Sequence, residues 1–202
     1  LGVPLGFIRA VAGGTSIETW LSAEALARDA QFAAVQARWR QTVANHAAQQ
    51  EAFAKALAIW EAETAAAKAA GRSASRPRPK PPSELGHNAP SAQFRGMIEP
   101  LMPYALRGIL WYQGESNHTR PAEYAALTAA MIRQWRAGFA QGDLPFFFVQ
   151  LPNYEQPSDK SGQLWAYLRE AQASALALPH TGMAVGIDLG DPQDLHPPNK
   201  PE

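Results

Sequence analysis

The side chains that could do chemistry gather in a few short segments. The first, at 112–118, follows an apolar run and holds two amides, a carboxylate, a hydroxyl and an imidazole, which are Gln113, Asn117, Glu115, Ser116 and His118. Amide N–H groups can donate hydrogen bonds to an oxyanion. A serine hydroxyl beside a base can act as a nucleophile. These residue types therefore indicate a site that stabilises negative charge developing on oxygen.

The second segment, at 191–200, contains His196 with an acid, Asp194, two residues before it. A carboxylate close to a histidine fixes its tautomer and stabilises its imidazolium form. His196 is therefore the best candidate for a general base, although a histidine in a surface loop would show the same pattern. A third segment, Gly13-Gly14, could expose backbone N–H groups to an oxyanion or could form an ordinary tight turn.

Ser116 and Glu115 each allow more than one interpretation. Ser116 stands in a G-x-S pattern, but the nucleophile elbow G-x-S-x-G needs glycine at the position that His118 occupies. Glu115 is interpreted as a carboxylate that holds the loop rather than as a catalytic acid. The sequence has no H-E-x-x-H or H-x-x-x-H spacing, no G-x-G-x-x-G and no P-loop, so we predict neither a metal nor a cofactor.

Apolar runs that alternate with helical patterns must position these segments. Strands are predicted at 4–12, 105–113, 144–152 and 182–190, and helices at 120–140 and 162–178. The strands lack polar alternation, which indicates a parallel sheet covered on both faces and therefore an α/β fold. Ligands bind beyond the carboxyl ends of such strands, and Gly14, Gln113 and His196 all fall there.

Residues 23–70 are rich in alanine and contain neither glycine nor proline, which predicts a long helix or a helical hairpin. Aromatic and histidine side chains recur every seven positions and predict a packing face, formed by Phe32, Trp39, His46, Phe53 and Trp60. Residues 71–85 are rich in proline and arginine and are predicted to form an extended, solvated linker. We therefore predict one domain over 1–202 with a helical insertion that could support a homo-oligomer.

The bulk composition narrows the class of protein. The 202 residues carry no formal net charge and 46% are hydrophobic, an ordinary globular mix. A neutral chain argues against a nucleic-acid or membrane partner, and no apolar run reaches the roughly 18 residues needed to span a bilayer. The absence of cysteine excludes disulfides and thiolate metal sites. The chain opens without an initiator methionine or a signal peptide, which we interpret as a fragment or a processed chain.

Taken in order, five segments resemble the sialate O-acetylesterase family, carbohydrate esterases of the SGNH-hydrolase superfamily. They are "GVPLGFIRAVAGGTSIETW" at 2–20, "GMIEPLMPYALRGILWYQGESN" at 96–117, "FFFVQLPNY" at 146–154, "WAYLREAQ" at 165–172 and "DLGDPQDLHPPNK" at 188–200. The most specific signals are "WYQGESN" and the "LHPPNK" ending. Together the segments cover most of the chain outside the helical insertion.

The resemblance implies a three-layer αβα SGNH-hydrolase fold of flavodoxin-like type, and hydrolysis of O-acetyl esters on sialic acid or a related acetylated sugar. It implies that His196 is the catalytic base and that Asp194, or a backbone carbonyl in its place, orients the ring. The remaining site is an oxyanion hole and substrate wall built from Gly14, Gln113, Asn117 and Glu115. The family needs no cofactor, and its frequent action on extracellular glycans leads us to expect a periplasmic or secreted location.

One feature of the family is absent from the sequence. The family's nucleophile is a serine in a "GQSNM"-like block before the "GGT" segment, and residues 1–202 contain no such block. We therefore expect the serine upstream of this chain, and the chain alone to be inactive. Two alternatives stay open: a catalytically incomplete carbohydrate-binding or scaffold protein on the same fold, and an esterase that uses Ser116.

Overall fold

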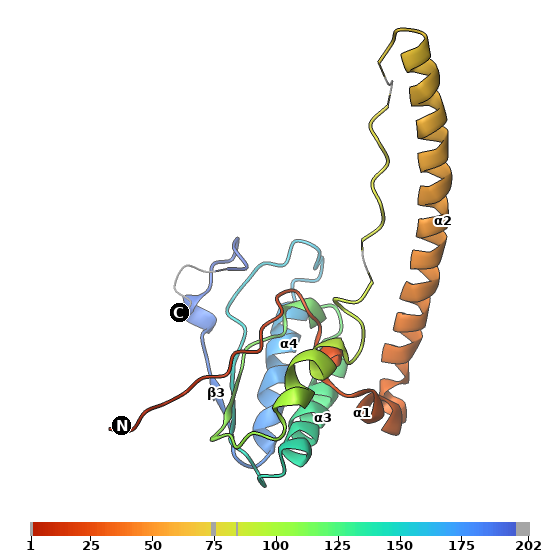
Figure 1. The fold of residues 1–202 in the computed structure, drawn as a ribbon. Helices are drawn as coiled ribbons and strands as arrows, with labels where there is room; N and C mark the ends of the chain where they lie inside the picture. Colours follow the sequence, from red (N-terminus) through yellow and green to blue (C-terminus); the bar gives the residue numbers. More distant parts are fainter. Residues whose placement is uncertain (1, 74–75, 84, 197–202) are drawn as a thin grey trace.

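The computed structural model describes residues 2–73, 76–83 and 85–196, which form a body and a long helical arm that projects from it (Figure 1). The body contains a parallel sheet whose strands lie in the order β1 (Ile109–Trp111), β2 (Phe146–Val149) and β3 (Thr181–Ala184). Helix α3 (Pro121–Phe139) joins β1 to β2, and α4 (Leu164–Ala173) joins β2 to β3. The predicted α/β class with a parallel sheet is confirmed.

Helices α3 and α4 pack on one face of the sheet. Successive side chains of a strand point to opposite faces. Ile109, Trp111, Phe146 and Phe148 therefore share the helical side, where all four are buried. Trp111 makes an edge-to-face contact with Trp135 of α3, with ring centroids 5.6 Å apart. Large aromatic side chains thus fill the space between the sheet and its helices.

The opposite face of the sheet is open among the described residues. Leu110 is 72% exposed and Phe147 is 50% exposed, and both belong to the face that α3 and α4 leave uncovered. The described residues therefore form the sheet and one of the two helical layers that the resemblance implied.

The predicted buried strand at 4–12 is wrong. These residues run as an unpaired segment, and Phe7 is 81% exposed. A strand is stable only when its backbone groups pair with a neighbouring strand. Among the described residues the sheet consists of β1, β2 and β3, and none of these strands pairs with segment 4–12. The predicted strand at 182–190 is also shorter, since β3 ends at Ala184 and a 3-10 turn, η7 (Ile187–Leu189), follows.

The arm consists of one long helix and a chain segment that returns along it (Figure 1). Helix α1 (Ala23–Arg28) and the turn η2 (Ala30–Phe32) lead into α2 (Ala33–Ala69), which has 37 residues. The helix runs this far because no glycine or proline interrupts it. No helix among the described residues is long and apolar enough to cross a bilayer.

The returning segment at 76–83 has no helix or strand and is mostly exposed, and two hydrogen bonds join it to α2. Trp60 donates its indole N–H to the Arg76 carbonyl at 2.9 Å, and His46 Nε2 lies 3.0 Å from the Ser83 carbonyl. Beyond residue 40, the half-buried side chains of α2 form a single stripe, made of His46, Phe53, Leu57, Trp60, Thr64 and Ala67. The side chains that recur every seven positions therefore mark the face of α2 that segment 76–83 partly covers.

Short turns complete the described chain. They are η1 (Ile17–Trp20), the π-helix η3 (Phe94–Ile98), and the 3-10 turns η4 (Glu99–Leu101), η5 (Glu115–Asn117) and η6 (Ser174–Ala177). Two of them, η1 and η5, hold the residues of the candidate site.

Candidate functional site

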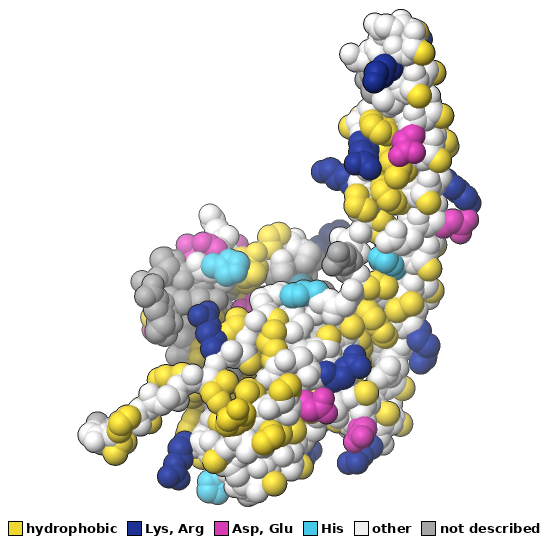
Figure 2. All heavy atoms as spheres, viewed as in Figure 1, with side chains coloured by type: hydrophobic (Ala, Val, Ile, Leu, Met, Phe, Trp, Pro, Cys, Tyr) yellow, Lys and Arg dark blue, Asp and Glu magenta, His cyan; other side chains and the backbone are white. Residues whose placement is uncertain are grey.

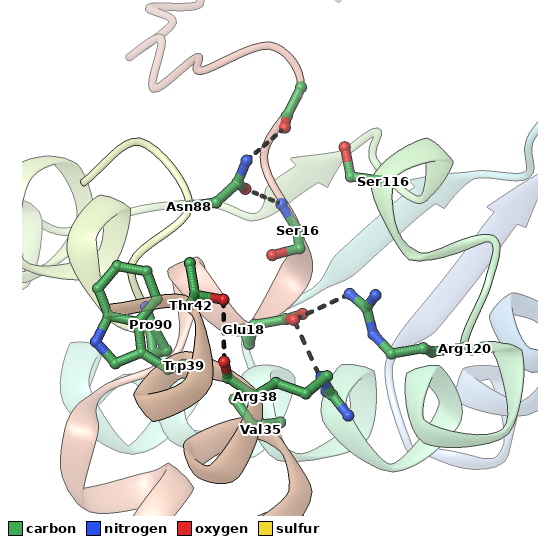
Figure 3. Close-up of a pocket in the computed structure, with 11 residues that line it drawn as sticks. Ser16, Glu18, Val35, Arg38, Trp39, Thr42, Asn88, Pro90, Ser116 and Arg120 are labelled. Atoms are coloured by element: carbon green, nitrogen blue, oxygen red, sulfur yellow. Dashed lines mark hydrogen bonds and ion pairs between the residues drawn. The ribbon is translucent and has the colours of Figure 1, made fainter. Parts of the chain in front are cut away.

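An open pocket of about 410 Å³ lies where the base of the arm meets the body (Figure 3). Four parts of the chain line it: η1 with the turn that leads into it, the first turns of α2, the segment at 88–90, and η5 with the residues that follow it. The lining residues are Gly14, Ser16, Glu18, Val35, Arg38, Trp39, Thr42, Asn88, Pro90, Ser116 and Arg120. Figure 3 shows Trp39 and Pro90 on one side of it and Ser116 and Arg120 on the other.

Gly14 lies in this pocket with a backbone conformation that favours glycine, since its φ is +70°. Its carbonyl accepts a hydrogen bond from the Asn88 amide at 3.3 Å, and His87 Nε2 lies 2.8 Å from the Gly13 carbonyl. No hydrogen bond among the described residues uses the Gly14 N–H. The turn is thus held through its carbonyl groups, and a backbone donor is left for a ligand oxygen.

Gln113 and Asn117 are buried and bonded to each other. Gln113 Nε2 donates to Asn117 Oδ1 at 2.9 Å and to the Thr15 carbonyl at 3.0 Å. Asn117 Oδ1 also accepts from the Ile17 N–H at 2.9 Å. Both Gln113 N–H groups therefore have protein partners in this structure. The pair joins the tip of β1 to η1 and does not line the pocket.

Tyr124 of α3 fixes the orientation of the Gln113 side chain. Its hydroxyl donates to the Gln113 carbonyl and to Gln113 Oε1, each at 3.0 Å. Burial raises the pKa of the Tyr124 phenol, and the negative charge of nearby Glu115 raises it further. The hydroxyl therefore stays protonated and acts as a donor.

Glu18 of η1 is the buried carboxylate that holds this region together. It is 6% exposed, accepts from Asn117 Nδ2 at 2.9 Å, and pairs with Arg120 at 3.1 Å. The sequence interpretation gave the loop-holding role to Glu115. Glu115 is instead half-buried, and its carboxylate makes no hydrogen bond with the described residues.

Ser116 lines the pocket, but no base is bonded to it. The hydroxyl of Ser116 makes no hydrogen bond within the described part of the chain. Its neighbour His118 instead directs Nδ1 to the Glu115 carbonyl at 2.8 Å and packs near the Trp165 ring. Ser16, the other serine at the pocket, also has no histidine partner there.

His196 and Asp194 lie together in an exposed loop. Their ring and carboxylate atoms approach to 3.9 Å, and Asp194 Oδ1 accepts from the His196 backbone N–H at 2.8 Å. The His196 side chain is 81% exposed. Among the described residues neither group bonds to Gly14, Gln113 or Asn117, and neither lines the pocket. The structure thus brings together the glycine turn and the tip of β1, but not the predicted base.

Several pocket residues were missed by reasoning from the sequence. Glu18 was passed over because an acid within "SIETW" gives no local sign that it becomes buried. Arg38 and Trp39 were assigned to a packing helix, and only the tertiary structure places them in the same pocket as Gly14. The one sign in the sequence was the presence of glutamate and arginine residues around this helix. In the structure these residues form the charged pairs of the pocket.

The chain is similar to known carbohydrate esterases. Residues 91–200, more than half of the chain, match the family model described as carbohydrate esterase, sialic acid-specific acetylesterase. The sialate O-acetylesterase of Mus musculus is 33% identical over 128 residues, which cover 54% of this chain and 24% of the relative. The Homo sapiens sialate O-acetylesterase is 31% identical over 136 residues, which cover 58% of this chain and 26% of the relative.

A solved structure agrees with these sequence matches. The crystal structure of a carbohydrate acetylesterase from Xanthomonas citri has 47% sequence identity and a TM-score of 0.54, and the match covers 56% of this chain and 27% of that one. The chain thus spans about a quarter of the length of the relatives that it matches.

Proposed function

The chain belongs to the carbohydrate esterase family of sialic acid-specific acetylesterases, and we propose that it forms part of an enzyme that removes O-acetyl groups from sialic acid or a related acetylated sugar. The observation that carries this proposal is the unbonded Gly14 N–H at the wall of the pocket. A backbone N–H fixed by its own turn is the kind of donor that stabilises the oxyanion of acyl transfer.

In the proposed reaction His196 takes the proton of a serine hydroxyl, and the serine oxygen attacks the acetyl carbonyl carbon. The carbonyl oxygen becomes an oxyanion that accepts from Gly14. The sugar leaves as its alcohol with the proton from His196, and an acetyl-serine remains. Water, which loses a proton to His196, then releases acetate and restores the serine. Acyl transfer of this kind needs no metal ion or cofactor.

Gln113 and Asn117 remain predicted oxyanion donors in this mechanism, but their present bonds set a condition. To reach a substrate oxygen, Gln113 would have to release Thr15 or Asn117. Glu115 stays a predicted part of the substrate wall. Asp194 is the proposed partner of His196, supported by their 3.9 Å approach.

We place the nucleophilic serine outside residues 1–202. Two observations support this placement. Ser16 and Ser116 border the pocket, and no described base bonds to either hydroxyl. In addition, among the described residues β1 pairs with β2 alone, and the apolar segment 4–12 lies exposed without a strand partner. A further strand beside β1 would cover its unpaired edge, and the carboxyl end of such a strand would lie near the tip of β1.

A fluorophosphonate probe tests the proposal, because it labels activated serines covalently. We compare residues 1–202 with the same protein extended upstream, and locate the adduct by intact mass and peptide mapping. The expected result is no adduct on 1–202, an adduct on an upstream serine of the extended protein, and loss of that adduct in His196→Asn. An adduct on Ser116 would show that the tip of β1 carries the nucleophile.

The second candidate is a carbohydrate-binding protein without catalysis. It is favoured by the exposed position of His196, which bonds to no pocket residue among those described. Sugar binding by the extended protein, without an adduct and without acetate release, would establish this alternative.

A further inference from the structure

We infer that the base of α2 forms a sugar-binding subsite, in which the Trp39 indole supports a neutral pyranose ring next to the acetylated one. The inference rests on the proposed function, because the pocket that Trp39 lines is the one that contains Gly14. The helical insertion thereby helps select the substrate. Residues 91–200 carry the family match, so Trp39 lies outside the part of the chain that the family model describes.

One face of α2 supplies this wall of the pocket. Val35, Arg38, Trp39 and Thr42 stand at positions i, i+3, i+4 and i+7, which bring side chains to the same side of a helix. All four line the pocket, and Figure 3 shows them grouped on the arm side of it. The helix therefore presents a continuous surface to a ligand in the pocket.

This surface is anchored to the body, so it is preorganised. Val35 is buried at 3% exposure within the hydrophobic core. Arg38 forms a two-point ion pair with Glu123 of α3, with N–O distances of 2.8 and 2.6 Å. Trp39 follows directly on Arg38 in the chain. The burial of Val35 and the ion pair of Arg38 therefore fix the part of α2 that carries the indole. A rigid aromatic wall costs little conformational entropy when a ligand binds.

The charges at the pocket are paired within the protein. Arg120 pairs with Glu18 at 3.1 Å, and Arg38 pairs with Glu123 and lies 4.0 Å from Glu18. Both arginines of the lining set are thus paired with protein carboxylates, so neither favours an acidic sugar at the Trp39 subsite. Neutral polar groups line the rest of the pocket instead, on Ser16, Thr42, Asn88 and Ser116.

This combination matches the chemistry of a neutral sugar. A pyranose ring has an apolar face of C–H groups and a rim of hydroxyls. The half-buried Trp39 residue offers a flat apolar ring, and the hydroxyl and amide groups elsewhere in the pocket can bond to the rim. The acetylated ring would lie towards Gly14, and its neighbour in the glycan would lie on Trp39.

The experiment compares Trp39→Ala with Trp60→Ala in the upstream-extended protein. Trp60 is a matched control, because it lies on the same helix and bonds to Arg76 of the arm. Acetate release is measured from an O-acetylated xylo-oligosaccharide and from triacetin, which has no ring to stack. We expect Trp39→Ala to lower kcat/KM for the oligosaccharide by about five- to tenfold, the loss of one aromatic contact. The loss on triacetin should be clearly smaller than the loss on the oligosaccharide, and Trp60→Ala should change neither rate.

Saturation-transfer NMR with the deacetylated xylo-oligosaccharide gives a readout that does not need catalysis. Binding should weaken in Trp39→Ala and persist in Trp39→Phe, which keeps an aromatic ring. Equal loss on both esters in Trp39→Ala, or unchanged oligosaccharide binding, would overturn the inference. If neither these esters nor an O-acetylated sialic acid is hydrolysed but the NMR signal still depends on Trp39, the proposed function fails while the subsite stands.

Discussion

Asn117 is the residue at which the two halves of the candidate site are joined. It accepts from Ile17 and Gln113 and donates to Glu18, and its side chain is 1% exposed. Because the Asn117 side chain is buried from water, each of these three groups loses its partner if the amide is removed. The order of the pocket wall therefore depends on a residue that does not itself face the pocket.

We expect Asn117→Ala to lower the free energy of unfolding by about 3 kcal/mol, since buried donors and acceptors would be left without partners. Urea denaturation measures the change. The control is Asn45→Ala, because Asn45 is exposed on the arm and accepts only from Gln41. Its effect should stay within about 0.5 kcal/mol. A small effect at Asn117 would show that water replaces the lost bonds.

Gly190 matters because the chain passes close to it. A Cβ atom there would lie 2.7 Å from the Asn153 backbone nitrogen and closer still to the Asn153 carbonyl oxygen. We expect Gly190→Ala to displace the loop that leads to His196 and to cost about 1–3 kcal/mol. Gly96→Ala is the control, since a Cβ at position 96 meets no atom within 4 Å. Loss of fluorophosphonate labelling in Gly190→Ala alone, in the extended protein, is the expected readout.

At the scale of single elements, Asp159 holds the first turn of α4. Hydrogen bonds from the Ser161 hydroxyl and from the Leu164 and Ser161 N–H groups hold the pKa of Asp159 below its ordinary value of 3.8. A lowered pKa means that the stabilising effect is fully present above 3.8 and is lost as pH falls through the folded-state value. The start of α4 should therefore loosen only in acid.

Asp159→Asn should reproduce this loosening at neutral pH, because the amide offers one acceptor oxygen where the carboxylate has two. Hydrogen exchange at the Leu164 and Trp165 amides measures it. The protection factors of both amides should be lower in the variant than in the wild type at pH 6, and acidification through the Asp159 pKa should lower them in the wild type but little further in the variant. Amides in the middle of α3 serve as the internal reference. If the protection factor of the Leu164 amide in the wild type does not fall in acid, Asp159 does not hold this turn.

At the scale of the whole molecule, the arm is the largest exposed element, and Figure 2 shows apolar and charged side chains mixed along it. Ala33–Ala69 at 1.5 Å per residue gives a length of roughly 55 Å. Segment 76–83 covers its aromatic stripe in part. Val43 and Ile59 remain 41% and 56% exposed and are available to a partner.

The arm stays the predicted element for association with a second copy. We expect sedimentation equilibrium to show a mass that rises with concentration, and replacement of residues 43–82 by a short turn to remove the rise. A variant with Val43→Gln and Ile59→Gln keeps the helix and should weaken association. An unchanged mass across the concentration range, with and without the arm, would rule out this role.

Much of this protein could be read from local patterns. The apolar runs at Ile109–Trp111 and Phe146–Val149 predicted strands, and the absence of glycine and proline predicted the long helix. The motif around Gln113 and Asn117 carried the resemblance that the family match confirms. These features are local because strand and helix preference, and motif spacing, depend on residues that are neighbours in the chain.

Only the tertiary structure decided where the separate segments of the candidate site meet. It left segment 4–12 unpaired, because a strand needs a neighbour that no local pattern supplies. It buried Glu18 against Asn117, 99 residues away, and brought Trp39 and Gly14 to the same pocket. Burial and pairing between distant residues depend on how whole elements pack, so composition and spacing determined the kind of fold and the family, and packing determined which side chains form the pocket.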